Sequence, residues 1–337
     1  MPTVNLGPTP GTEPAVVVPG RVRMELARLV ALAQAGSVRL PFDVTAVEAA
    51  LATDATGTAA DEARRAWYAR LSSETPSPED ALAGLLAQQV GRVHAAAADE
   101  PGPDAEAARA AQQEALAVLG RPEALLEVEL GLRLGPGAPE QVRAWVAVRG
   151  QAAVSLGTVS GADFELSWGA VAALPEMLAH LVRLPEAPYD EDAGPVADLP
   201  PRFTLPVELM AAVDASAQRH REELLPALVE RFPLATTGAD GEAYDAAATQ
   251  GLLNAVHDRL TARLRVLVPG VQDDGARLSG AGVVVWMRVG EQWFALDPDL
   301  VAGIPVARAT AVEPRDLARW VGPVIARVRG KEGDGDG

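Results

Sequence analysis

The 337-residue chain contains no cysteine. It can therefore form neither a disulfide nor a thiolate metal site, which fits a reducing compartment. No apolar run reaches the roughly 18 residues that a membrane-spanning helix requires. The first residues, MPTVNLGPTPGTEP, lack the basic and apolar regions of a signal peptide. We therefore expect a cytoplasmic protein that does not insert into a membrane.

Basic residues are scarce as well. Asp and Glu number 46 against 29 Lys and Arg, the formal net charge is −17, and Lys331 is the single lysine. Binding to nucleic acid depends on clustered Lys and Arg side chains that release counterions from the phosphates. The charge balance therefore disfavours nucleic acid as a partner. Hydrophobic residues make up 48% of the chain, which is ample for a buried core.

Familiar catalytic and cofactor motifs are also missing. We find no Walker loop, no GxGxxG after a strand, no GxSxG elbow, no HExxH and no Ca²⁺ loop. The histidines occur singly, which predicts surface or capping roles rather than metal binding: His94, His180, His220 and His257. Two carboxylate pairs stand beside Gly or Pro, where turns favour aspartate: Asp273 with Asp274, and Asp297 with Asp299. We predict no catalytic residue, no metal site and no cofactor.

The first half of the chain combines helices with a β meander. Residues 1–20 are rich in Pro and Gly and predict a flexible arm. Residues 21–184 form the first half, which begins with helices in RVRMELARLVALAQAGSVRLPF, in DEARRAWYARLSS and after TPSPED. From residue 122 the pattern alternates in LLEVELGLRL, VRAWVAVRG, QAAVSLGTV and ADFELSW, which predicts antiparallel strands. The helix AVAALPEMLAHLVRL closes the half.

The second half repeats this order after an acidic, Pro-rich linker at residues 185–200. Residues 201–330 begin with helices in FTLPVELMAAVDASAQRHREELLPALVERF and EAYDAAATQGLLNAVHDRL. The strands RLRVLV, GVVVWMRV and EQWFALDP, the extended PVARATAV and the helix EPRDLARWVGPVIARV follow, before a disordered acidic tail at residues 331–337. Trp145 in WVAVRG corresponds to Trp286 in WMRVG. This order predicts an α+β fold of two pseudo-symmetric halves, with two unrelated α+β units as the alternative.

The surroundings of the tryptophans favour a structural role. Trp145, Trp286 and Trp293 fall on sheet strands, where such side chains more often belong to the core than to a ligand platform. In the strand VRAWVAVRG, the alternation places Trp145 on one face with Arg143 and Arg149. The opposite face receives Val142, Ala144, Val146 and Val148.

Six segments share an order and a hydrophobic pattern with a known family: MELARLVALAQAGSVRLPF, LAVLGRPEALLEVELGLRL, VRAWVAVRGQAAVSL, LPPRFTLPVELM, GAGVVVWMRVGEQWFAL and AVEPRDLARWVGPVI. Together they resemble the EspG family of actinobacterial type VII (ESX) secretion chaperones. The resemblance spans most of residues 21–330. It implies a cytosolic chaperone that holds the apolar tip of a PPE protein in a PE–PPE heterodimer and keeps this secretion substrate soluble.

The resemblance also implies partner-binding residues. Family contacts come largely from the turn between the second and third strands of the meander and from the C-terminal helical part. The first segment corresponds to Arg149, Gly150, Gln151 and Ala152, and the second lies near Leu252, Val256 and Leu260. Two alternatives stay open: an enzyme of unrecognised class, a hydrolase or transferase using His220, His257, Asp273 or Asp297, and a non-catalytic scaffold protein.

Overall fold

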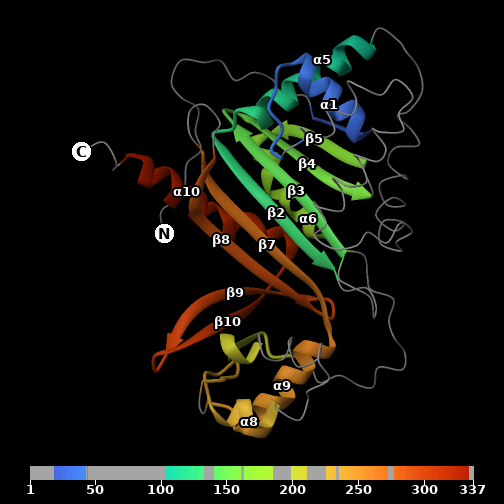
Figure 1. The fold of residues 1–337 in the computed structure, drawn as a ribbon. Helices are drawn as coiled ribbons and strands as arrows, with labels where there is room; N and C mark the ends of the chain where they lie inside the picture. Colours follow the sequence, from blue (N-terminus) through green and yellow to red (C-terminus); the bar gives the residue numbers. More distant parts are fainter. Residues whose placement is uncertain are drawn as a thin grey trace.

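The computed structural model describes residues 19–42, 44, 104–132, 140–160, 163–184, 199–210, 225–232, 235–271 and 277–333. Within these residues the chain forms a single ten-stranded antiparallel sheet with helices on its two faces, so the α+β prediction is confirmed (Figure 1). Several predictions lie outside the described residues: the arm up to residue 18, the helices at 61–73 and after TPSPED, the linker at 185–198, and the sites His94, His220, Asp273 and Asp274. The domain boundaries stay predictions.

The sheet runs in the order β1-β5-β4-β3-β2-β7-β8-β9-β10-β6. The strands of the first half are β1 (Gly20–Glu25), β2 (Ala124–Leu132), β3 (Glu140–Arg149), β4 (Ala152–Ser160) and β5 (Asp163–Ala170). Those of the second half are β6 (Arg202–Pro206), β7 (Leu260–Val271), β8 (Arg277–Val289), β9 (Gln292–Val301) and β10 (Ile304–Val312). Each half forms a five-stranded block, and β2 pairs with β7 where the blocks meet.

Helices cover the two faces unequally (Figure 1). On one face lie α6 (Leu174–Val182) and α10 (Leu317–Gly333), which pack on a core shared by the two halves. On the other face, α1 (Leu26–Ala35) and α5 (Asp104–Gly120) cover the first half, and α8 (Leu225–Glu230) and α9 (Ala246–Asp258) cover the second. Short 3₁₀ turns, η1 (Val171–Ala173) and η3 (Pro314–Asp316), lead into α6 and α10. Within the described residues, no helix is both long and apolar enough to span a bilayer.

The strand pairing confirms the predicted pseudo-repeat. Each half has an outer strand, helices, a four-stranded meander and a closing helix, and the two blocks are related by a pseudo-twofold axis through the sheet. Leu126 pairs with Val146, and Leu264 pairs with Trp286. Val146 precedes the turn glycine Gly150 by four residues, and Trp286 precedes the turn glycine Gly290 by the same four. Leu126 and Leu264 are therefore equivalent positions, and so are Val128 and Val266, which pair directly with each other on the axis.

The two outer strands correct the sequence prediction, which placed helices there. Residues 20–25 form β1, and the helix begins at Leu26. The stretch GRVRME alternates charged and apolar side chains, but Val22 also matches the helical spacing of the residues that follow. The backbone partners of β1 come from β5, about 140 residues away, and Arg23 is held there by a 2.6 Å ion pair to Asp163. Likewise, residues 202–206 form β6 and pair with β10.

The proposed correspondence of Trp145 with Trp286 is wrong by one residue. Measured from the turn glycines Gly150 and Gly290, Val146 is the counterpart of Trp286. A shift of one residue along a strand moves a side chain to the opposite face of the sheet. Trp145 therefore packs toward α1 and α5, whereas Trp286 packs in the shared core with its ring centroid 6.1 Å from that of Trp293. All three tryptophans are core residues, as predicted.

Candidate binding face

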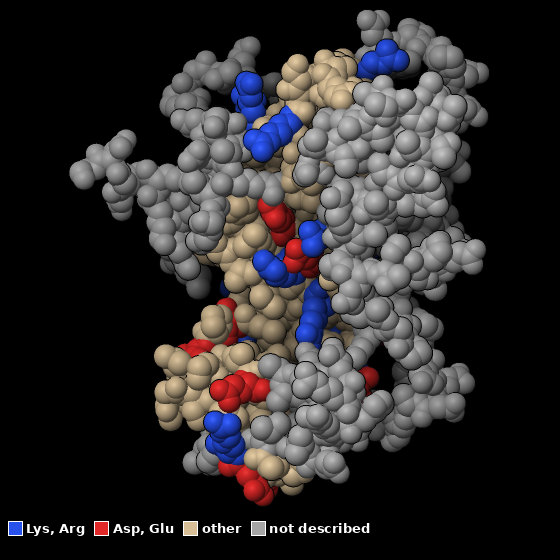
Figure 2. All heavy atoms as spheres, in the orientation of Figure 1, with Lys and Arg blue, Asp and Glu red and all other residues tan. Residues whose placement is uncertain are grey.

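The helix pairs α1/α5 and α8/α9 lie on the same side of the sheet, and no described helix covers the strands between them. We call this part of the sheet the central face. Alternation along the strands identifies it: Trp145 packs under α5, and Arg143, two residues earlier on β3, points to the same side. Met287 packs under α8 and α9, and Val285 on β8 points to that side as well. The described residues of the central face are Glu127, Glu129, Arg143, Arg263, Arg265, Leu267, Val283 and Val285. Figure 2 shows basic and acidic side chains gathered at mid-height on this side of the molecule.

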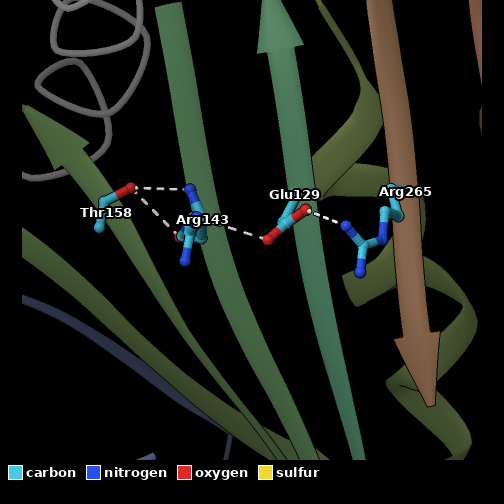
Figure 3. Close-up of polar contacts among 4 residues, drawn as sticks. All are labelled: Glu129, Arg143, Thr158 and Arg265. Atoms are coloured by element: carbon cyan, nitrogen blue, oxygen red, sulfur yellow. Dashed lines mark hydrogen bonds and ion pairs between the residues drawn. The ribbon is translucent and has the colours of Figure 1, made fainter. Parts of the chain in front are cut away.

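A row of charged side chains crosses the central face (Figure 3). Glu129 on β2 stands between arginines on the two neighbouring strands. Its Oε1 lies 3.5 Å from Nη2 of Arg143, and its Oε2 lies 3.3 Å from Nη1 of Arg265. The alignment follows from the register, because Glu129 pairs with Arg143 on one side and with Arg265 on the other. Cross-strand neighbours of opposite charge stabilise a sheet modestly.

These ion pairs are loose and partly exposed, with Arg143 at 30% and Glu129 at 36% exposure. Charge-assisted hydrogen bonds of this type measure about 2.7–2.9 Å, and both pairs are longer. The Arg265 side chain is 53% exposed. Pairs of this kind contribute about 0–1 kcal/mol. The row therefore adds little to the stability of the fold, and its charges remain accessible to a partner.

Thr158 fixes the backbone of Arg143. The β3–β4 ladder ends at the pair Ala144–Gly157, and the β4–β5 register shifts between Thr158 and Ser160. The Thr158 hydroxyl replaces the missing ladder bonds, since it accepts from the Arg143 N–H at 3.0 Å and donates to the Arg143 carbonyl at 3.2 Å. Thr158 is itself buried. The start of the charged row is therefore held in place although the strands separate there.

An apolar strip adjoins the charged row. Val285 pairs with Arg265, and Val283 pairs with Leu267, so these side chains lie directly beside the arginine strand. Val283 is 52% exposed, a large fraction for a valine on a central strand. Charged and apolar side chains thus share one surface, the combination that protein interfaces use for affinity and specificity.

The predicted turn residues form the hairpin between β3 and β4. Arg149 pairs with Ala152, so that Gly150 and Gln151 make a two-residue turn. Gly150 has a φ of 55°, a conformation that favours glycine. Its N–H donates to Oε1 of Glu123 at 3.1 Å. Arg149 and Gly150 are exposed, so this turn is accessible, and its role in partner binding stays a prediction.

The predicted helical contacts lie on and next to α9. Asp245 caps this helix, because its carboxylate accepts from the Ala248 N–H at 2.8 Å. Leu252 and Val256 are buried in the core under α8 and α9, and Leu260 packs against the same core. In this conformation the three side chains stabilise the helical layer. Partner binding there stays a prediction and would require that layer to move.

The two predicted contact segments lie at opposite ends of the central face. Ala124, at one end of β2, pairs with Val148 next to the turn of Gly150. Leu132, at the other end of β2, pairs with Ala262 close to Leu260. The nine residues of β2 span roughly 30 Å at about 3.3 Å per residue. A partner that touches both segments must therefore cross the charged row.

The described titratable candidates are dispersed. His180 lies on α6 and His257 on α9, while Asp297 and Asp299 lie on β9. Burial, followed by the charge of Arg21, lowers the pKa of His180, and burial raises the pKa of Asp297. Within the described ranges, no group of three or more His, Cys, Asp or Glu side chains could hold a metal ion. Catalytic use of His257 or Asp297 stays a prediction.

Sequence reasoning placed Arg143 on the face of Trp145 but missed the charged row. The signal was present in two strands, because LLEVELGL alternates Glu127 and Glu129 with apolar residues, and ARLRV does the same with Arg263 and Arg265. Its meaning depended on β2 pairing with β7, and these strands lie far apart in the chain. Alternation along a strand tells on which face of the sheet a side chain lies, but it does not tell which residue of the paired strand lies beside it.

No family model and no curated protein match the chain. Among solved structures, it is similar to the Mycobacterium tuberculosis type VII secretion system chaperone EspG5, whose structure was determined in complex with a PE25–PPE41 dimer. The sequence identity is 14% and the TM-score 0.43, over 92% of this chain and 95% of that chain.

Proposed function

We propose that the chain is a cytosolic binding protein of the chaperone type, which holds the apolar tip of a PPE-type protein and keeps this substrate soluble for type VII secretion. The observation that carries the proposal is the central face, an open surface of mixed apolar and charged side chains between two helical layers. The segments that resemble the EspG family give the partner class.

The geometry supports an elongated partner. The accessible turn at Arg149–Ala152 and the α9 region stand at opposite ends of the face, and the exposed Val283 lies on β8 between the two helical layers. A helical tip laid across the sheet would bury Val283, Val285 and Leu267 and so hide its own apolar residues from self-association. Burying one such side chain stabilises a complex by about 1.5–3 kcal/mol. Charged neighbours would fix the orientation.

Co-expression with a PE–PPE heterodimer tests the proposal. We expect a soluble complex that elutes as one species in size-exclusion chromatography. Val283→Asp should weaken the complex at least tenfold, because it places a charge in the apolar contact. Leu300→Asp is the matched control, since Leu300 is 67% exposed and lies on β9 outside the central face. If the pair stays aggregated and no complex elutes, the proposed function is wrong.

A further inference from the structure

We propose that the central face recognises a carboxylate on its partner, bound by Arg143 and Arg265, and that the partner segment is an amphipathic helix. The inference rests on the proposed function, because it specifies the chemistry of the same surface. It adds a requirement that an apolar contact alone does not make. An acidic residue must stand beside the apolar stripe of the bound helix.

The charge of the face supports this choice. The chain carries a net charge of −17, yet the central face holds three arginines and two glutamates: Arg143, Arg263, Arg265, Glu127 and Glu129. A guanidinium group has five N–H donors, and Glu129 shares its two oxygens between two such groups. The row therefore has more donors than its one glutamate can satisfy.

The distances indicate that the arginines can turn to a second carboxylate. Both ion pairs to Glu129 exceed the length of a close charge-assisted bond, at 3.5 and 3.3 Å. The Arg265 side chain is more than half exposed, so an incoming group can reach it without displacing core residues. Planar guanidinium groups bind carboxylates in a fork geometry that lysine does not offer. Glu129 competes with the partner for the same donors.

The spacing of the surface specifies the helix. Val285 is the cross-strand neighbour of Arg265, and Val283 lies one step of two residues further along β8. Such neighbours are separated by about 5–7 Å. On an α-helix, side chains three or four residues apart lie about 5–6 Å from each other. The matching helix therefore carries Asp or Glu three or four residues from a large apolar side chain.

Two designed peptides provide the probe. Each is a fluorescent, covalently stapled helix with leucines seven residues apart and one variable position four residues after the first leucine. This position is glutamate in one peptide and glutamine in the other. We expect the glutamate peptide to bind the full-length protein at least fivefold more tightly at low salt. The ratio should approach one in 0.5 M NaCl, because screening at that ionic strength is strong.

Variants of the row make the test specific. Arg265→Glu should abolish the preference for the glutamate peptide, whereas Glu129→Gln should raise the affinity for it severalfold by removing the competing carboxylate. The matched controls are Arg183→Glu and Glu176→Gln. These residues form an exposed ion pair at 3.1 Å between the C-cap and the first turn of α6, on the opposite side of the sheet. Equal affinity for the two peptides, no binding of either, or equal effects of Arg265→Glu and Arg183→Glu would overturn the inference.

The inference and the proposed function can fail separately. If the PE–PPE complex forms but its dissociation constant is the same for wild type, Arg265→Glu and Glu129→Gln, the carboxylate contact is wrong and the function stands. If the peptides behave as expected but no PE–PPE complex forms, the contact stands and the partner class is wrong.

Discussion

Replacing Trp286 tests the core that the two halves share. Trp286 is 0% exposed, and within the described residues its indole N–H has no hydrogen-bond acceptor. Truncation to alanine removes the largest fully buried side chain of the described residues, and such changes cost about 3–5 kcal/mol. Phenylalanine leaves a cavity of roughly 40 Å³, which with the lost transfer energy costs about 2 kcal/mol. It also removes a buried unpaired N–H, which is worth about 1–3 kcal/mol.

We therefore expect Trp286→Phe to change the free energy of unfolding by less than about 1 kcal/mol, and Trp286→Ala to lower it by about 3–5 kcal/mol. Urea unfolding followed by far-ultraviolet circular dichroism measures both. Trp293→Phe is the control, since Trp293 is 3% exposed in the same core and is not among the described side chains with a buried unpaired atom. It should cost about 2 kcal/mol. If Trp286→Phe is as costly as Trp293→Phe, the reasoning about the indole N–H is wrong.

Three further predictions concern other parts of the fold. Gly282→Ala should destabilise by about 1–3 kcal/mol, because a Cβ there would overlap the Val324 side chain on α10, and Val324→Ala in the same protein should recover most of the loss in a urea titration. Asp245→Ala should cost about 1 kcal/mol through loss of the α9 cap, whereas Asp245→Asn should cost less. Burial lowers the pKa of His180 in the folded protein, so below pH 6.5 the unfolded chain binds a proton more readily than the folded one. The neutral His180 therefore destabilises the fold increasingly as the pH falls below 6.5, and has no such effect well above it. The thermal midpoint of His180→Asn should therefore fall less than that of wild type between pH 7.5 and 5, and equal falls would contradict this.

The meander strands and closing helices were predictable because their signals are local. In VRAWVAVRG the alternation assigned Val146 and Trp145 to opposite faces, and the structure places them in different cores. Outer strands were not predictable in this way. The six residues of β1 contain too few alternations to outweigh the helical spacing of Leu26 and Leu29, and pairing with β5 decides their conformation.

The candidate site likewise combines features that local sequence patterns indicate with features that depend on contacts between distant segments. Glu129 and Arg265 alternate with apolar neighbours in the sequence, but the charged row was not predicted, because it exists only where β2 pairs with β7 and sets these two residues opposite each other. The helical residues Leu252 and Val256 were placed by resemblance, which does not report burial. Their position under α8 and α9 depends on the contacts of that layer, and these come from segments distant in the chain.

The pair Val128–Val266 has a consequence for the history of the chain. Equivalent residues that face each other across an antiparallel seam have the arrangement of two identical subunits joined edge to edge around a dyad. Either half alone would expose one long backbone edge and half of a helix-covered core, and a second copy of itself could satisfy both. The molecule thus has the form of a fused homodimer. The side chains do not follow the symmetry of the strands, since Glu127 in one half occupies the position of Arg265 in the other.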